Sequence, residues 1–325
     1  MTPDEYAAIV IGRNEGDRLI DCLSSLQSTV DFIVYVDSGS TDGSVSAAER
    51  LGATVLALDM TQPFTAARAR NEGFALLRKL RPNIEFVQFI DGDCILDKNW
   101  MKLATDFIAV RDDVAVVGGR RRERYPTATL YNRLCDIEWN TPIGQALACG
   151  GDSLVRVSAF EALGGFAGQL IGGEESELCV RLREKGWKIW RLDAEMTRHD
   201  AALNRFGQWW RRATRFGYAI VEVSRLHWHS PCAVWKTELR RAVLWGAALP
   251  AIISLSILVN PAALAAMLIY PFQVCKIAVA RGATSSDSWL FASFVTLAKF
   301  AEFQGVLMFY WRRLKRRPVE WIEYK

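Results

Sequence analysis

The chain has 325 residues, of which half are hydrophobic and 23% are charged, and its formal net charge is +4. So small a charge does not indicate nucleic-acid binding, and we predict no nucleic-acid partner. The apolar share is high for a soluble protein with this charge content, and the excess lies between residues 242 and 311. Composition therefore predicts a globular part followed by a membrane-associated part.

Short apolar runs alternate with helical periodicity from residue 7 onward. Strands are predicted at 7–12, 32–36, 54–58 and 85–90, and helices at 19–26, 44–52 and 65–80. This alternation is typical of βαβ units around a parallel sheet. After residue 114 the order becomes mixed, with strands at 114–119 and 154–157 and a helix at 174–186. The predicted fold class is α/β, with a mixed, mostly parallel sheet flanked by helices.

Polar residues follow three of the predicted strands at the point where each apolar run ends. These residues are Arg13, Asp37 and Asp91. Because open α/β sheets bind ligands at the carboxyl ends of their parallel strands, we expect a binding site at this edge.

Five segments, taken in order, resemble the family 2 glycosyltransferases of the GT-A fold. They are IVIGRNEGDRL (9–19), VDSGSTDGS (36–44), ARARNEG (67–73), FIDGDCIL (89–96) and IGGEESELCVRLREKGW (171–187). The resemblance covers residues 7–220, and its specificity lies in the whole series, because an Asp-X-Asp motif alone is common. It implies a nucleotide-diphospho-sugar transferase fold, a nucleotide-sugar donor and a divalent ion.

The acidic motif is the candidate metal site. A nucleotide sugar releases a nucleoside diphosphate, and hard oxygen ligands that hold Mg2+ or Mn2+ neutralise the charge growing on its phosphates. We assign Asp93 to the metal and Asp91 to metal or ribose, with Gly92 between them at the donor. An Asp-Gly-Asp turn with solvated carboxylates is the alternative. His199 lies where some family members place a late metal ligand, although a structural histidine is the commoner case.

The resemblance also assigns residues to the nucleotide. Asp37 is expected at the base or ribose, and the first loop brings Arg13, Asn14 and Glu15 nearby. Arg70 and Asn71, on the predicted helix at 65–80, belong near the nucleotide in the family pattern. An exposed arginine that serves only solubility is the alternative for Arg70. Residues 40–42 could simply cap the next helix.

The general base that accepts the proton of the attacking hydroxyl should lie in GEESEL, at the start of the helix at 174–186. The family pattern makes the second member of an acidic pair the base, which corresponds to Glu175, with Glu174 beside it. This chain has glutamate where aspartate is commoner. Acidic residues also favour any helix N-terminus, so both explanations can hold.

The C-terminal part divides into three expected segments after a GT-A catalytic domain at 1–205. Residues 206–241 read as an amphipathic interfacial linker, in which Gln208 and Arg211 are only reminiscent of a processive Gln-X-X-Arg-Trp motif, because Arg212 replaces the tryptophan. Residues 242–280 predict a membrane hairpin around Asn260 and Pro261. Residues 281–325 predict an interfacial or membrane helix and a basic tail.

Charge sets the expected topology. Basic residues border the apolar part, which indicates contact with anionic membrane lipid: Arg240, Arg241, Arg312, Arg313, Lys315, Arg316 and Arg317. The positive-inside rule predicts that both ends of the hairpin lie in the cytoplasm, because Lys236, Arg240 and Arg241 precede it and Arg281 follows it. Lys299 and Glu302 interrupt the third apolar stretch, so we expect it to lie in the interface or against the hairpin, with a third span as the alternative.

Cysteine usage and the N-terminus give the expected location. The seven cysteines lack zinc or disulfide spacing, which fits a reducing cytosol. The first residues show no basic stretch followed by an apolar one, so we expect no secretory signal. The prediction is a bacterial inner-membrane protein with a cytoplasmic catalytic domain.

The predicted function is inverting transfer of a hexose-type sugar to a hydroxyl of a lipid-linked glycan or other glycan acceptor, in surface polysaccharide synthesis. The alternatives are a polyprenyl-phosphate glycosyltransferase, a processive polysaccharide synthase and a non-catalytic membrane scaffold.

Overall fold

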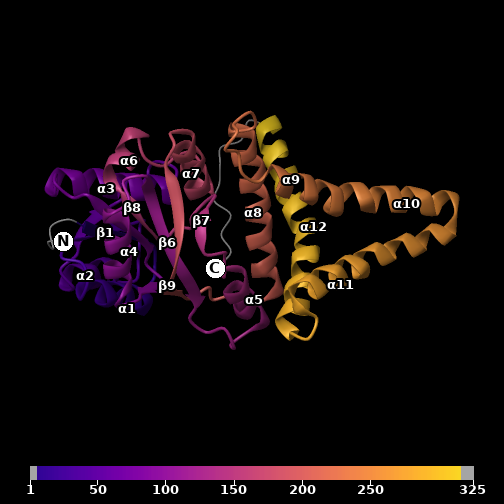
Figure 1. Cartoon of the computed structure of the whole chain (residues 1–325), viewed down its shortest axis with the longest axis horizontal. Coiled ribbons are helices and arrows are strands. Elements are labelled where there is room, and N and C mark those ends of the chain that lie inside the picture. The colour runs from indigo at the N-terminus through magenta and orange to yellow at the C-terminus, as the bar shows by residue number, and fades with distance from the viewer. Residues whose placement is uncertain (1–5, 316–325) are drawn as a thin grey trace. The chain divides into compact units, whose positions relative to one another are not determined.

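The computed structural model describes residues 6–315, which form two compact units. The first contains residues 6–124, 139–201 and 230–232, and the second contains residues 125–138, 202–229 and 233–315. The segment 125–138 groups with the C-terminal helices. Figure 1 shows the elements of both units in chain order.

The first unit begins with four parallel strands, as the alternating pattern predicts. They are β1 (Tyr6–Gly12), β2 (Ile33–Asp37), β3 (Thr54–Ala57) and β4 (Phe86–Asp91), connected by α1 (Asp17–Gln27), α2 (Ser44–Arg50) and α3 (Ala66–Leu80). The strands are apolar because both faces of the sheet are covered. Thr65 ends the loop before α3, where its hydroxyl accepts a hydrogen bond from the Arg68 N–H.

The second half of the sheet mixes strand directions. It consists of β5 (Cys94–Leu96), β6 (Val114–Glu123), β7 (Gly144–Ala146), β8 (Ser153–Arg156) and β9 (Lys188–His199). The full order is β3-β2-β1-β4-β8-β6-β9-β5, with β7 paired to β9. The long strand β9 carries His199 to its end, where that residue pairs with Cys94 of β5.

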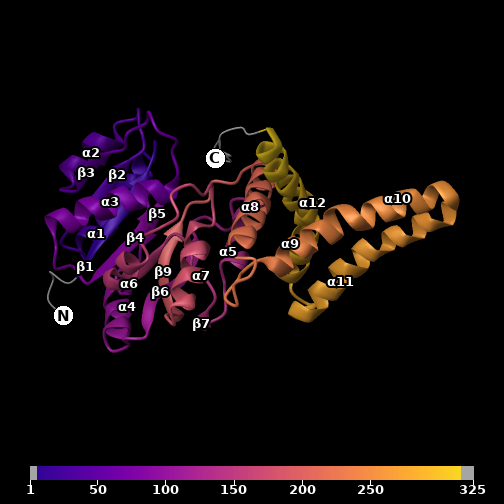
Figure 2. The same cartoon turned by 90° about the horizontal axis from the view of Figure 1, so that it is seen from above.

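Helices cover both faces of this sheet. On one face, α3, α6 (Val157–Ala162) and α7 (Glu174–Glu184) contribute to a core that includes Phe89 and Phe160. On the other face, α1, α2 and α4 (Trp100–Ala109) pack around Tyr35 and Trp100. Figure 1 shows the helices on opposite sides of the sheet, and Figure 2 shows the same elements from above. This three-layer arrangement confirms the predicted mixed, mostly parallel α/β fold.

The second unit is helical. It contains α5 (Leu130–Glu138), α8 (Phe206–Leu226), α9 (Lys236–Val243), α10 (Leu249–Val259), α11 (Ile269–Gly282) and α12 (Ser286–Lys315). A π-helical stretch (Leu244–Ala248) joins α9 to α10, and a 3-10 stretch (Pro261–Leu268) precedes α11. Asn260 forms the turn between α10 and the 3-10 stretch, where its side chain accepts a hydrogen bond from the Ala262 N–H. Figure 1 shows α10 and α11 as the two arms of a hairpin.

Within the residues described, three helices are long and apolar enough to cross a membrane: Lys236–Val259, Pro261–Gly282 and Ser286–Lys315. The hairpin arms expose many large apolar side chains, among them Leu258, Val259 and Phe272. The third helix is more buried, because α12 packs along α8. Its Lys299 Nζ lies 2.7 Å from Glu302 Oε2, so the two ionisable groups that interrupt the apolar stretch neutralise each other.

Candidate active site

The sheet brings the predicted site residues to one edge. Asp37 ends β2 and pairs with Gly12, while Asp91 ends β4 and pairs with Ile11, so both carboxylates flank the end of β1. The first loop, which contains Arg13, follows the same strand. The fold therefore gathers these predicted residues at the edge of the sheet expected from the strand ends.

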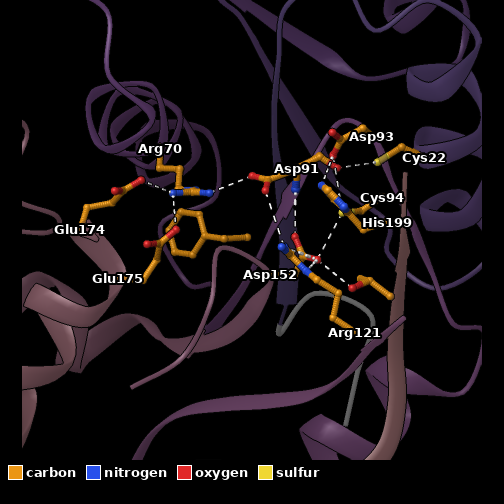
Figure 3. A network of polar contacts seen from close by, with 12 residues as sticks. Cys22, Arg70, Asp91, Asp93, Cys94, Arg121, Asp152, Glu174, Glu175 and His199 are labelled. Atoms are coloured by element: carbon orange, nitrogen blue, oxygen red, sulfur yellow. Dashed lines mark hydrogen bonds and ion pairs between the residues drawn. The ribbon is translucent and has the colours of Figure 1, made fainter. Parts of the chain in front are cut away.

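Arg70 is the centre of the ion-pair network drawn in Figure 3. Its side chain is 3% exposed, and one terminal nitrogen donates to Glu174 at 2.8 Å and to Glu175 at 3.0 Å. The other terminal nitrogen donates to Asp91 at 2.8 Å. Burial on α3 excludes the solubility role, because a solvating arginine would extend into water. Arg70 therefore connects the acidic motif to the acidic pair at the start of α7.

Asp91 is held between two guanidinium groups. Besides Arg70, the Arg121 Nη2 lies 3.6 Å from the second Asp91 oxygen. Although burial opposes ionisation, the charges of Arg70 and Arg121 hold the pKa of Asp91 below its usual range. Asp91 is therefore an anion that is already engaged by the protein.

Asp93 and His199 form the candidate metal pair. The His199 Nε2 lies 3.3 Å from Asp93 Oδ1, and both side chains are buried. Burial, together with the Arg121 charge, lowers the pKa of His199 to about 4, so its imidazole is neutral and keeps a lone pair for a metal. Cys94 completes a group whose ligand atoms lie within 4.8 Å of one another. Burial raises the pKa of this thiol, which disfavours its ionisation and its use as a ligand.

The donor set fits a hard divalent cation. In the network of Figure 3, five carboxylates (Asp91, Asp93, Asp152, Glu174 and Glu175) meet two guanidinium groups, so negative charge is in excess. His199 Nδ1 is also buried without a hydrogen-bond partner in the described part of the chain. Carboxylate ligands are suited to Mn2+ or Mg2+.

The two glutamates at the start of α7 have different surroundings. Glu174 is 5% exposed and Glu175 is 17% exposed, although both contact Arg70. Burial and the neighbouring Glu174 charge raise the pKa of Glu175 to about 7, against the attraction of Arg70. A partly accessible carboxyl with a pKa in this range can accept a proton near neutral pH.

The nucleotide-side residues predicted from the sequence also organise their own loops. The Asp37 carboxylate accepts hydrogen bonds from the Gly39 and Ser40 N–H groups and from the Tyr35 hydroxyl. Asn14 has a positive φ of 55°, and its Oδ1 accepts the Thr41 N–H at 2.7 Å. The β1 and β2 loops are thereby tied to each other.

The other four residues predicted at the donor differ in their exposure and in their contacts. Arg13 is exposed on the first loop, whereas Glu15 forms an ion pair with Arg18 at 2.7 Å. The Gly92 N–H donates to the Ile11 carbonyl. Asn71 exchanges two hydrogen bonds with the backbone of Phe166, at 2.8 and 2.9 Å. Asn71 thus holds the loop before α7 rather than extending into open space.

The helix after the β2 loop starts without a side-chain N-cap. Its N-cap is Gly43, and Asp42 Oδ1 accepts hydrogen bonds from both the N–H and the hydroxyl of Ser44. Asp42 is therefore engaged at the helix start, one residue before the capping position.

Sequence reasoning missed Asp152 and Arg121, which lie in the centre of the network. Asp152 follows Gly150 and Gly151, and Arg121 lies in a run of three arginines. A charged residue directly before a buried strand was the available signal for Asp152. At Gly151, a Cβ atom would lie 2.5 Å from Arg70 Nη2 and 3.2 Å from Asp91 Oδ2, so the network requires glycine there.

The fold identifies the class of protein structure to which this chain is similar. The mannosyltransferase PcManGT from Pyrobaculum calidifontis, solved in complex with GDP-Man and Mn2+, matches with a TM-score of 0.61 and 20% identity. The match covers 95% of this chain and 88% of that one. The structure therefore has the GT-A glycosyltransferase fold.

Comparison of the sequence with protein families and with known proteins gives a more specific result than the fold. Residues 7–163 match the model described as Glycosyl transferase family 2, so this part of the chain is a family 2 glycosyltransferase domain. The O-antigen chain rhamnosyltransferase WbaN of Salmonella anatum is 25% identical over 182 residues, which cover 52% of this chain and 56% of that protein. An uncharacterized glycosyltransferase of Rickettsia felis is 40% identical over 53 residues, or 16% of this chain and 19% of that protein. The chain thus spans between about a fifth and just over half of these relatives' lengths.

Proposed function

We propose that the protein is a metal-dependent, inverting glycosyltransferase. It moves a hexose-type sugar from a nucleotide-sugar donor to a hydroxyl of a lipid-linked glycan or other glycan acceptor. The observation that carries the proposal is the network of ion pairs in which Arg70 contacts both Glu175 and Asp91. Asp91 precedes Asp93 by two positions, and Asp93 contacts His199. A carboxylate for proton transfer and a donor set for a cation are thus linked by one buried guanidinium.

Asp93 and His199 would hold Mg2+ or Mn2+, and Asp91 adjoins them. The bound ion supplies neutralisation of the charge that develops on the diphosphate leaving group. The neutral state of His199 supports this assignment, because a protonated imidazole could not donate a lone pair. The Asp37 loop and the loop at residues 13–15, which the sequence resemblance assigns to the nucleotide, flank the same strand end.

Glu175 would act as general base. Its carboxylate accepts the proton of the acceptor hydroxyl as that oxygen forms a bond to the anomeric carbon, and the bond from that carbon to the diphosphate oxygen breaks. The nucleoside diphosphate leaves, and the configuration at the sugar carbon inverts. Arg70 orients Glu175 by its 3.0 Å contact, so a base and a leaving-group site are positioned by the same side chain.

The helical unit and the relatives support the proposed class of acceptor. Three helices suited to a membrane support an acceptor presented at a lipid surface. One relative is named as an O-antigen chain rhamnosyltransferase, which supports polysaccharide synthesis as the setting. We place the protein at the bacterial inner membrane, in contact with membrane lipid, with the catalytic unit in the cytoplasm.

The test is release of nucleoside diphosphate by the purified full chain in detergent. UDP-, GDP- and dTDP-sugars are supplied in turn with Mn2+, with Mg2+ or with excess chelator, in the presence of bacterial lipid extract. We expect one donor class to be consumed only when a divalent ion is present. Consumption that persists undiminished in chelator would contradict metal dependence. Folded protein that consumes no donor would favour the scaffold.

A further inference from the structure

The carboxylate of Asp152 is fully buried and receives hydrogen bonds from several elements of the sheet. Its Oδ1 accepts the backbone N–H of Asp91 at 3.2 Å. Its Oδ2 accepts from the Thr197 hydroxyl at 2.7 Å, from the Arg121 Nε at 2.9 Å and from the Cys94 thiol at 3.3 Å. A buried carboxylate that accepts hydrogen bonds from four donors is rigidly held.

Two of these donors lie close in sequence to the members of the candidate metal pair, Asp93 and His199. Asp91 precedes Asp93 by two positions, and Thr197 precedes His199 by two positions on β9. Positions two apart in a strand face the same side, so fixing Thr197 also fixes the direction of His199. One Asp152 carboxylate therefore sets the spacing between the β4 end and the β9 end, which are far apart in sequence.

Arg121 extends this support to the acidic motif. Its Nη2 lies 2.7 Å from Asp152 Oδ2 and 3.6 Å from Asp91 Oδ2. The guanidinium also lies over the Trp139 ring, with its Cζ 5.5 Å from the ring centroid. Arg121 is therefore held by the Asp152 carboxylate and by the Trp139 ring. In this position its guanidinium also attracts the Asp91 carboxylate.

We infer that Asp152 and Arg121 are positioning residues, which hold Asp93 and His199 at the separation that a divalent cation requires. The inference rests on the proposed function, because it assigns the support of that same metal site. Neither residue needs to touch the cation. Partners of this kind orient metal ligands, and their loss costs about 10- to 100-fold in metal affinity.

The test measures Mn2+ binding by the purified full chain, using the electron paramagnetic resonance signal of free Mn2+. This readout needs no identified sugar donor. In Asp152→Asn the amide nitrogen places a donor against the Thr197 or Asp91 donors. We expect the half-saturating Mn2+ concentration to rise about 10- to 100-fold while circular dichroism stays unchanged. Thr197→Val, which removes one donor from the same carboxylate, should change the affinity in the same direction by less.

The matched control is Glu177→Gln. Glu177 is likewise a buried carboxylate, with its side chain 5% exposed, and it is paired with an arginine, Arg181, but it lies outside the network. It should lose stability without losing Mn2+ affinity. Equal losses in Asp152→Asn and Glu177→Gln would overturn the inference, since they would reflect general destabilisation. If Asp152→Asn does not fold, an unchanged affinity in Thr197→Val overturns it.

The wild-type titration separates this inference from the proposed function. Wild-type protein that binds Mn2+, together with an Asp152→Asn variant that binds it equally well, would overturn the positioning role alone. A wild-type protein that binds no Mn2+ would overturn both the metal site and its support.

Discussion

Asp93, in the turn between β4 and β5, and His199, at the end of β9, face each other as buried groups. Replacing Asp93 by asparagine removes one charge but keeps nearly the same shape, so the fold should persist. We expect Asp93→Asn to abolish sugar transfer and to weaken Mn2+-dependent binding of nucleoside diphosphate. Calorimetric titration with and without Mn2+ measures the effect, and circular dichroism controls for folding. Full activity in this variant would remove Asp93 from the metal site.

Glu175 differs from Glu174 by its greater exposure, and this difference decides which is the expected base. Glu175→Gln should keep its affinity for the donor, because its proposed task is proton removal, while turnover falls by about two to four decades. Steady-state kinetics separate the two quantities. Glu174→Gln is the matched control at the neighbouring position. Should it prove to be the more damaging change, the base has been assigned one residue too late.

The raised pKa of Glu175 predicts a particular pH dependence. A general base must be deprotonated, so turnover should be low in acid and rise as the pH increases through about 7. His199, with its pKa lowered to about 4, stays neutral over this window and adds no titration of its own. Turnover is measured between mildly acidic and mildly basic pH. In Glu175→Gln this rise should disappear, and a rise of the same size there would assign it to another group.

Two glycines decide how α8 packs along α12. A Cβ atom at Gly217 of α8 would lie 2.1 Å from the Glu302 carbonyl oxygen, and one at Gly305 of α12 would lie 2.1 Å from that of Thr214. The two backbones are therefore in contact, as in close helix pairs that use small residues. This contact holds α12 in place and buries the Lys299–Glu302 ion pair.

Gly217→Ala should force the two helices apart, at a cost of about 1–3 kcal/mol typical of an overpacked site. The apparent melting temperature in detergent should fall. Gly207→Ala, in the first turn of the same helix, is the control, because its nearest side-chain atom would be at 3.7 Å. It should be neutral or slightly stabilising, since alanine favours helix formation. Equal melting of the two variants would show that the close contact is unimportant.

The topology of the whole molecule depends on the hairpin and on α12. The positive-inside rule predicts that both ends of the hairpin, which carry basic residues, lie in the cytoplasm, with Asn260 at the far tip. The Lys299–Glu302 ion pair lowers the free-energy cost of burying α12 in a membrane. This weakens the argument that these two charges prevent a third span. The basic residues after α12 still oppose export of the tail.

Single cysteines at Asn260 and Lys325, in a variant without the seven native cysteines, can test this topology. Lys325 lies outside the described residues. Labelling intact spheroplasts with an impermeant thiol reagent should leave Lys325→Cys protected, and permeabilised cells serve as the control for reactivity. External labelling of Lys325→Cys would establish α12 as a third span. Labelling of Asn260→Cys would show that the hairpin reaches the outer surface.

Periodicity and short motifs predicted much of this protein because their signals are local. The parallel strands and the helix at 65–80 follow from the spacing of neighbouring apolar residues, and the structure has them with ends shifted by a residue or two. The apolar stretch after residue 241 likewise predicted helices with a turn at Asn260. The series of motifs identified the family for the same reason, because each motif occupies one loop or one helix start.

The long-range pairs had no such signal. No local pattern shows that β9 runs beside β5, which is what brings His199 to Asp93. Nor does one show that Arg70 lies buried among three carboxylates, or that Asp152 accepts hydrogen bonds from distant strands. A charge's partners depend on which elements the fold packs together, and burial then sets its pKa. The sequence thus determined the elements and the family, while tertiary packing determined the network that joins base, metal pair and support.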